Sequence, residues 1–237
     1  MPNTWFQFKQ FRINQDRSAM KVGTDGVLLG AFINVDGVKR IADMGCGTGL
    51  VALMLAQRSG ATIDGIELDQ NAAFQAAENF SASPWPERLN CICGDIEQVS
   101  KLLDGEFDLA VCNPPYFPGH VRPPDENRSN ARHLKDQEWF AWFSSAYKMT
   151  TSTGKAVFIF PYEDKEERLQ TAEKAGFFPE LILNVRPKPG KAFKRFVVQF
   201  LKEKVETEIK ELTIETHQRG IYTNEFKTLM KDFYLNF

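Results

Sequence analysis

The feature that most constrains the fold is a glycine-rich turn between two apolar segments. Residues 40–44 have the pattern of a short buried strand, and residues 50–57 have that of a buried helix. Between them stand Gly45, Gly47 and Gly49. Glycine lets backbone N–H groups and the positive end of the following helix approach an anion closely. The stretch therefore predicts a strand, turn and helix that bind a phosphate or a carboxylate.

The spacing of these glycines narrows the class of ligand. A dinucleotide fingerprint has a glycine where this chain has Leu50, and a P-loop has Lys followed by Ser or Thr after its glycines, which this chain lacks. What remains is Asp43 followed by three alternating glycines. An oxidoreductase is therefore the least favoured enzyme class.

Strand and helix patterns alternate through the rest of the chain. Apolar runs predict strands at residues 62–67, 89–93 and 107–112, and a helix at 71–80. The alternation predicts an α/β fold with helices on both faces of a mostly parallel sheet. Residues 117–135 are rich in Pro, Asn and Arg and are expected to form a loop over the substrate. Further helices are expected at residues 138–149, 165–175 and 225–233, and further strands at 155–160, 180–185 and 197–201.

Four successive strand segments are each followed by, or end in, a polar residue: Asp43, Glu67, Asp95 and Asn113. Glu67 stands where doubly wound folds hydrogen-bond the ribose hydroxyls of an adenosine moiety. Asp95 offers an acceptor to an adenine amino group, although an Asp at such a place is more often only a helix cap. Its position in the series favours a ligand role.

The tetrapeptide Asn113-Pro114-Pro115-Tyr116 directly follows a buried strand. The Asn113 side chain and the Pro114 carbonyl offer two acceptors, and two consecutive prolines fix φ so that both keep their aim. Tyr116 adds a flat face. This set suits a planar group with an exocyclic NH2, such as adenine, cytosine or a carboxamide. The alternative is an ordinary strand-ending turn, since Asn and Pro are common in turns.

Near the start of the chain, residues 20–30 read Met-Lys-Val-Gly-Thr-Asp-Gly-Val-Leu-Leu-Gly. Thr24 or Asp25 is expected to cap a short apolar helix. Lys21 is either a solvated charge or a cation that lies over a bound cofactor.

These motifs, in this order, resemble those of the class I S-adenosylmethionine-dependent methyltransferases of the amino-methylating branch. That branch includes adenine N6, cytosine N4, guanine N2 and glutamine N5 enzymes. Residues 20–30 and 231–235 further resemble the bacterial tRNA adenine-N6 methyltransferases that modify the adenine beside the anticodon of a valine tRNA. The resemblance extends over nearly the whole chain.

The resemblance implies a Rossmann-like class I methyltransferase fold with a seven-stranded, mostly parallel sheet and a terminal antiparallel hairpin. It implies S-adenosyl-L-methionine as cofactor, with the glycine turn and Asp43 at its methionine end, Glu67 at the ribose and Asp95 at the adenine. The catalytic residues would be Asn113, Pro114, Pro115 and Tyr116. The cofactor-binding residues would be Lys21, Asp43, Gly45, Cys46, Gly47, Gly49, Glu67, Leu68, Asp95, Ile96 and Asn113.

A basic stretch, residues 186–195, holds five cations and no acid. Without them the formal charge of −2 would be −7, so a polyanion would be attracted here and repelled elsewhere. A solvated loop is the alternative, but five uncompensated cations favour contact with an RNA backbone. The predicted partner is tRNA, and the predicted RNA-binding residues are Arg122, Arg128, Arg186, Lys188, Lys191, Lys194 and Arg195.

Composition sets the remaining expectations. With 237 residues, 43% of them hydrophobic and 25% charged, we expect one domain, which the resemblance implies is a methyltransferase domain, and we expect it to act as a monomer. It divides into an N-terminal cofactor-covering segment (1–38), a catalytic core (39–202) and a C-terminal extension (203–237). The sequence has no apolar run of membrane length and no signal-peptide pattern, which predicts a cytoplasmic protein. Its four cysteines lack the spacing of a zinc site, so we expect no metal and reduced, buried, structural thiols.

The motifs are also compatible with three different functions. Glutamine-N5 methyltransferases of release factors share Asn-Pro-Pro-Tyr, but they carry a sizeable helical domain before the glycine turn, where this chain has only some forty residues. An rRNA amino-methyltransferase would use the same motifs on a larger RNA. A non-catalytic RNA-binding module would keep the fold without the reaction, and the intact glycine turn and Asn-Pro-Pro-Tyr argue against it.

Overall fold

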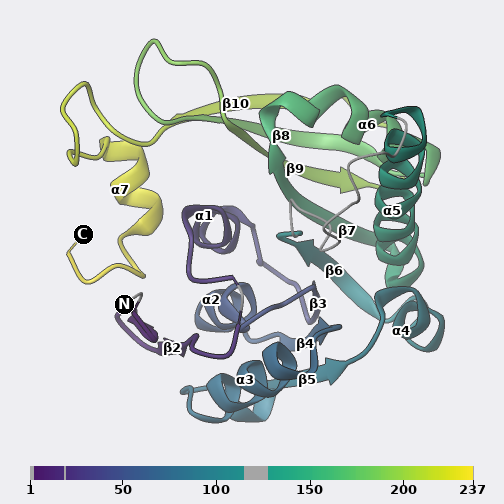
Figure 1. Ribbon diagram of the computed structural model, residues 1–237, viewed down its shortest axis with the longest axis horizontal. Coiled ribbons are helices and arrows are strands. Elements are labelled where there is room, and N and C mark those ends of the chain that lie inside the picture. The colour runs from purple at the N-terminus through teal and green to yellow at the C-terminus, as the bar shows by residue number, and fades with distance from the viewer. Residues whose placement is uncertain (1–2, 19, 115–127, 237) are drawn as a thin grey trace.

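The computed structural model describes residues 3–18, 20–114 and 128–236, and for residues 128–136 it describes the backbone only (Figure 1). Its centre is an eight-stranded sheet with the order β10-β8-β9-β7-β6-β3-β4-β5. All neighbouring pairs are parallel except those of β9, which runs antiparallel to β7 and β8. The strands are β3 (Arg40–Met44), β4 (Thr62–Glu67), β5 (Leu89–Cys93), β6 (Phe107–Cys112), β7 (Thr150–Pro161), β8 (Phe178–Arg186), β9 (Arg195–Leu201) and β10 (Glu208–Thr213).

Helices cover both faces of the sheet, as predicted (Figure 1). One face carries α1 (Thr24–Phe32), α2 (Leu50–Arg58), α3 (Gln70–Ser81) and α7 (Asn224–Met230). The other carries α4 (Ile96–Leu102), α5 (Arg128–Met149) and α6 (Lys165–Lys174). The shorter elements are β1 (Trp5–Gln7), β2 (Arg12–Asn14), η1 (Pro86–Arg88) and η2 (Tyr162–Asp164).

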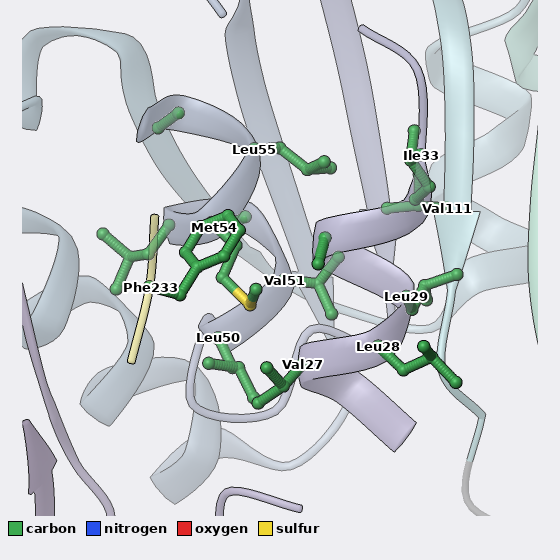
Figure 2. Packing of buried hydrophobic residues seen from close by; sticks show 14 of the residues in the cluster. Val27, Leu28, Leu29, Ile33, Leu50, Val51, Met54, Leu55, Val111 and Phe233 are labelled. Carbon is green, nitrogen blue, oxygen red and sulfur yellow. The ribbon is translucent and has the colours of Figure 1, made fainter. Parts of the chain in front are cut away.

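Helices α1 and α2 pack closely because two glycines of α1 face α2. A Cβ at Gly30 would lie 2.9 Å from the Cβ of Met54, and one at Gly26 would lie 3.0 Å from Cδ2 of Leu50. Around these contacts Val27 and Val51 complete an apolar interface (Figure 2). Burial of this kind stabilises by roughly 25 cal/mol per Å² of apolar surface. The interface fixes α1 over the sheet edge where β3 and β6 end.

The opposite face of the sheet is packed largely with phenylalanine. Phe158 and Phe160 of β7 stack on each other with ring centroids 5.5 Å apart, and Phe143 of α5 lies edge-on to Phe200 of β9. Such aromatic pairs add about 0.5–1.5 kcal/mol beyond the area that they bury. They join α5 firmly to the strands that follow the Asn-Pro-Pro-Tyr motif.

The two ends of the chain lie side by side (Figure 1). The backbone N–H of Lys9 donates to the carbonyl of Phe233 at 2.9 Å, and the Phe8 ring stacks on Tyr234. Beyond the expected core, β10 of the C-terminal stretch joins the sheet as an edge strand parallel to β8.

Four expectations need correction. The sheet has eight strands where seven were predicted, because β10 was not anticipated. The predicted loop at residues 117–135 is wrong for its last part, because α5 begins at Arg128. Neither Thr24 nor Asp25 caps α1, whose N-cap is Gly23 without a side-chain bond. The cysteines are free, but Cys93 is exposed and Cys91 is half-buried, so not all four are buried.

Candidate active site

The order β5-β4-β3-β6 brings to one edge of the sheet the four polar residues that were predicted to stand at or just after strand ends. These strands are parallel neighbours, so their carboxyl ends lie together. Asp43 lies in β3 and Glu67 ends β4, while Asp95 and Asn113 follow β5 and β6. In open α/β sheets this edge is where ligands bind.

The glycine turn connects β3 to α2 through left-handed backbone. Gly45, Gly47 and Gly49 have φ values of 68°, 55° and 82°, which side chains rarely adopt. A Cβ at Gly49 would overlap the Phe80 ring, and one at Gly45 would lie 3.1 Å from Cη2 of Trp142. At Gly47 a Cβ would meet nothing within 4 Å. Packing therefore excludes a side chain at Gly49 and crowds one at Gly45, whereas the space beside Gly47 is open to a ligand.

Asp43 is a buried carboxyl group beneath this turn. Its Oδ2 accepts the backbone N–H of Ala52, in the first turn of α2, at 2.9 Å. Burial raises the pKa of Asp43 to about 7, with a further increase from Glu67, while the bond from Ala52 acts in the opposite direction. Near neutral pH the group is divided between its two protonation states. A cation placed nearby would favour the charged form.

Glu67 links the turn to the start of α3. Its Oε2 accepts the N–H of Gly47 and its Oε1 accepts the N–H of Asp69, each at 2.9 Å. An ionised carboxylate has about four lone-pair sites, so these two bonds leave acceptor capacity for hydroxyl groups. The next residue, Leu68, has a side chain that is 69% exposed and offers an apolar surface at the same edge.

Asp95 is the N-cap of α4, which confirms the helix-cap interpretation. Its Oδ1 accepts the N–H groups of Glu97 and Gln98 at 2.9 and 3.2 Å. Both bonds use one of the two carboxylate oxygens. Ile96, at the start of α4, is half-buried beside it. An additional ligand role for Asp95 stays a prediction.

Asn113 directly follows β6 and is half-buried against α1. Its Nδ2 lies 3.4 Å from the position of a Cβ on Gly26. Pro114 is buried. Pro115 and Tyr116, the other half of the motif, lie outside the described residues.

Two predicted cofactor ligands are engaged by the protein itself. The Nζ of Lys21 donates to the carbonyls of Gln15 and Ser18 and so closes the N-terminal segment on itself. The thiol of Cys46 occupies the space above Gly65, whose strand partner is Cys91. A hydrogen bond to Cys91, with burial second, raises the pKa of Cys46 well above its usual range. Cofactor contact by Lys21 and Cys46 remains a prediction.

The basic stretch connects β8 to β9 at the same edge of the sheet. The expectation that its five cations are uncompensated is wrong for three of them. Arg186 pairs with Glu211, Lys188 with Glu215 at 3.2 Å, and Arg195 with Asp25 at 2.7 Å. Within the part of the chain that the structure describes, Lys191 and Lys194 form no ion pair. Of the other predicted RNA ligands, Arg122 and the side chain of Arg128 lie outside the described residues.

Two contacts of this region were not anticipated from the sequence. Trp142 of α5 contacts the glycine turn at Gly45, nearly a hundred residues away along the chain. Asp25 pairs with Arg195 across the site. Trp142 belongs to no motif, and Asp25 was expected only as a possible helix cap, so the fold alone identifies these two contacts.

Among the described residues, no group of three or more His, Cys, Asp or Glu side chains is placed to hold a metal ion. None of the helices in the described ranges is long and apolar enough to cross a membrane.

Comparison with known proteins agrees with this geometry. A family described as "Methyltransferase domain" matches residues 41–154. A predicted O-methyltransferase from Agrobacterium tumefaciens has the same fold, with a TM-score of 0.71 at 21% identity over 88% of this chain and 96% of that one. A tRNA1(Val) (adenine(37)-N6)-methyltransferase from Trichodesmium erythraeum is 42% identical over 100% of both chains, and one from Yersinia enterocolitica is 40% identical over 98% of this chain and 93% of its own. With such identity over essentially its whole length, the chain belongs to the family of tRNA1(Val) (adenine(37)-N6)-methyltransferases.

Proposed function

We propose that the chain transfers a methyl group from S-adenosyl-L-methionine to N6 of the adenine at position 37 of a valine tRNA. The observation that carries this proposal is the placement of Asn113 and Pro114 directly after β6, beside the glycine turn on the neighbouring strand β3. The names of the full-length relatives support the choice of substrate.

The residues around the turn fit this cofactor. The carboxylate of the cofactor would lie in the open space beside Gly47, at the N-terminus of α2, and its ammonium would lie near Asp43. Glu67 keeps acceptor capacity for the ribose hydroxyls, and Asp95 for the adenine amine. The cofactor supplies a methyl group on a positively charged sulfur, which is already electrophilic. Leu68 and Ile96 would lie against the faces of the adenine.

The remaining task of the protein is to aim the amine of the substrate. The lone pair of an adenine amine is delocalised into the ring, which makes the amine a poor nucleophile. Two acceptors, the side-chain oxygen of Asn113 and the carbonyl oxygen of Pro114, would hold its two N–H bonds and direct the lone pair at the methyl group. Orientation at roughly 3–3.5 Å is itself a large source of rate. The proton that the amine loses passes to water or to a backbone group, so this chemistry requires no strong general base, in keeping with a motif that has no histidine or carboxylate.

The function can be tested with labelled cofactor and three substrates: total tRNA, total rRNA and a release factor. We expect label in tRNA alone and N6-methyladenosine on nucleoside analysis. A valine tRNA transcript with guanine at position 37 should accept no label. Label in the release factor would instead support the glutamine-N5 reaction, and label in rRNA would support the rRNA reaction.

Glu67 gives the first test of the cofactor site. Glu67→Ala should weaken cofactor binding by roughly 1–3 kcal/mol, because buried hydroxyls would lose their acceptor. Isothermal calorimetry measures this change. Glu78→Ala, which removes an exposed carboxylate of α3, is the matched control and should bind as the parent does. Unchanged affinity in Glu67→Ala would remove Glu67 from the site.

The basic stretch gives a test of RNA binding. We assign phosphate contacts first to Lys191 and Lys194, and we retain Arg186, Lys188, Arg122 and Arg128 as further candidates. Replacing both lysines with Gln should lower the salt dependence of tRNA binding, because each lost phosphate contact reduces the slope by about 0.9 or less. Cofactor affinity should stay the same. If the double variant kept the salt slope of the parent but bound the cofactor more weakly, the basic stretch would contact the cofactor and not the tRNA.

We further propose that the chain acts in the cytoplasm, where tRNA is modified, and that it acts as a monomer. Light scattering with and without tRNA tests the oligomeric state, and a mass of two chains per tRNA would contradict it.

A further inference from the structure

Asp25 and Arg195 form an ion pair between two elements that flank the candidate active site. Asp25 lies in the first turn of α1, and Arg195 is the first residue of β9. The Nε of Arg195 donates to Oδ2 of Asp25 at 2.7 Å, and the two side chains are only 33% and 22% exposed. A short, partly buried bond between charged groups is among the stronger contacts that side chains make.

The same turn of α1 lies beside Asn113. Gly26, the residue after Asp25, is so close that a Cβ there would lie 3.4 Å from Nδ2 of Asn113 and 3.0 Å from Cδ2 of Leu50. The amide of Asn113 is planar, so the backbone of Gly26 near Nδ2 also limits where its oxygen can lie. The first turn of α1 is therefore one wall of the space in which that amide is oriented.

Arg195 lies in the sheet, whereas the N-terminus of α1 has no side-chain cap. Arg195 is paired in register with Pro161 of β7 and Val185 of β8. Gly23, the N-cap of α1, makes no side-chain cap bond. The ion pair thus connects the first turn of α1 to β9, which lies between β7 and β8 in the sheet.

We infer that Arg195 is a positioning residue for methyl transfer, which through Asp25 fixes the first turn of α1 against the amide of Asn113. This inference rests on the proposed function of Asn113. The inference gives Arg195 a different role from Lys191 and Lys194 of the basic stretch, which are assigned to tRNA phosphates. In addition to the bond to Asp25, its Nη1 donates to the carbonyl of Lys194 at 2.9 Å, so two of its donors are directed at the protein.

A double-mutant cycle tests the inference: Asp25→Asn, Arg195→Gln and the two together. The measurements are the single-turnover rate at saturating enzyme and cofactor, and the affinity for tRNA at several salt concentrations. We expect the single-turnover rate of each single variant to fall about tenfold, since a small misplacement of reacting groups slows a reaction strongly. The double variant should lose no more than the singles, because they break one connection. The salt slope should match that of the parent.

A matched ion pair at the opposite edge of the sheet provides the control. Lys155 of β7 and Glu180 of β8 pair at 3.0 Å with side chains 42% and 33% exposed. Lys155→Gln and Glu180→Gln remove a comparable bond and should transfer methyl groups at the parent rate. Hydrogen exchange adds a readout that does not need activity: the Val27 amide, which donates to the Gly23 carbonyl, should exchange faster in the Asp25 and Arg195 variants than in the controls.

The outcomes separate three cases. If Arg195→Gln lowers the salt slope by about 0.9 and Asp25→Asn tightens tRNA binding, with parent rates at saturation, Arg195 is a phosphate ligand and the inference is wrong. If the variants melt earlier but transfer at the parent rate, the pair is only structural, which also overturns it. If the parent itself methylates no tRNA, the proposed function is wrong, and the parent is therefore assayed before any variant.

Discussion

Asn113→Ala will lower the single-turnover rate of methyl transfer by about a hundredfold, and most of this loss will remain when tRNA and cofactor are saturating. The variant removes one of two acceptors that aim the amine of the substrate. That interaction strengthens in the transition state, so its loss affects the rate more than the affinity. The loss of a comparable oriented hydrogen-bonding group in other enzymes lowers the rate by about 10²–10³.

Two comparisons make this measurement specific. Asn90→Ala removes an exposed amide of β5 that bonds to Asp64, far from the carboxyl edge, and should react as the parent does. Tyr116→Phe keeps an aromatic plane and should retain most activity, whereas Tyr116→Ala should also weaken capture of the base by roughly 1–3 kcal/mol. If Asn113→Ala transferred methyl groups at the parent rate once tRNA was bound, the motif would be only a strand-ending turn.

The sequence was most informative where an element is buried on both faces. Strand β6 matches its prediction, residues 107–112, because a strand of a parallel sheet reads as a nearly continuous apolar run, here interrupted by Asp108 alone. Strand β10 reads Glu-Ile-Lys-Glu-Leu-Thr and is largely exposed, so its pattern is that of a polar edge. The first turns of α5 read Arg-Ser-Asn-Ala-Arg-His and resemble a loop by composition. Both were missed because neither sequence has the apolar pattern that predicts a buried helix or strand.

For the candidate site, the sequence predicted that four polar residues stand at or just after strand ends, but not what these residues contact. The placement of Glu67 followed from strand order alone, whereas its bond to the N–H of Gly47 depends on the path of the turn. The pairing of Arg195 with Asp25 joins residues 170 positions apart, and charge counting within the basic stretch could not show it. A local run of cations therefore overstated the free positive charge of this loop.

Asp43→Asn will stabilise the protein without cofactor at pH 8 and at the same time weaken cofactor binding. The pKa of Asp43 is raised from an ordinary 3.8 to about 7 by burial, so the folded state holds a proton that the unfolded state has already lost. Below about pH 4 the carboxyl group is protonated in both the folded and the unfolded state, so its burial does not lower the free energy of unfolding through titration. As the pH rises from about 4 to 7 the free energy of unfolding falls, and the full penalty remains above pH 7. At 1.36 kcal/mol per pKa unit it amounts to roughly 4 kcal/mol as an upper limit.

Asparagine removes this titration but keeps an oxygen that can accept the N–H of Ala52. Urea unfolding at pH 4.5, 6 and 8 should therefore show a variant that is close to the parent at low pH and more stable by a few kcal/mol at pH 8. Asp36→Asn, at an exposed turn, is the control and should follow the parent at every pH. Parallel profiles for Asp43→Asn and the parent would mean that Asp43 does not carry the pH dependence.

The same proton connects stability to ligand binding. A cation bound beside Asp43 favours the deprotonated carboxylate, so cofactor binding should release a proton, and the affinity of the parent should rise as the pH increases from about 6 to 8. In Asp43→Asn the ammonium loses its charged partner, which should lower the affinity and remove this pH dependence. Calorimetry in two buffers of different ionisation enthalpy measures the released proton directly. Equal heats for the parent in both buffers would show that the buried carboxyl group does not exchange its proton for the cofactor, and Asp43 would then serve only to hold α2 against the turn.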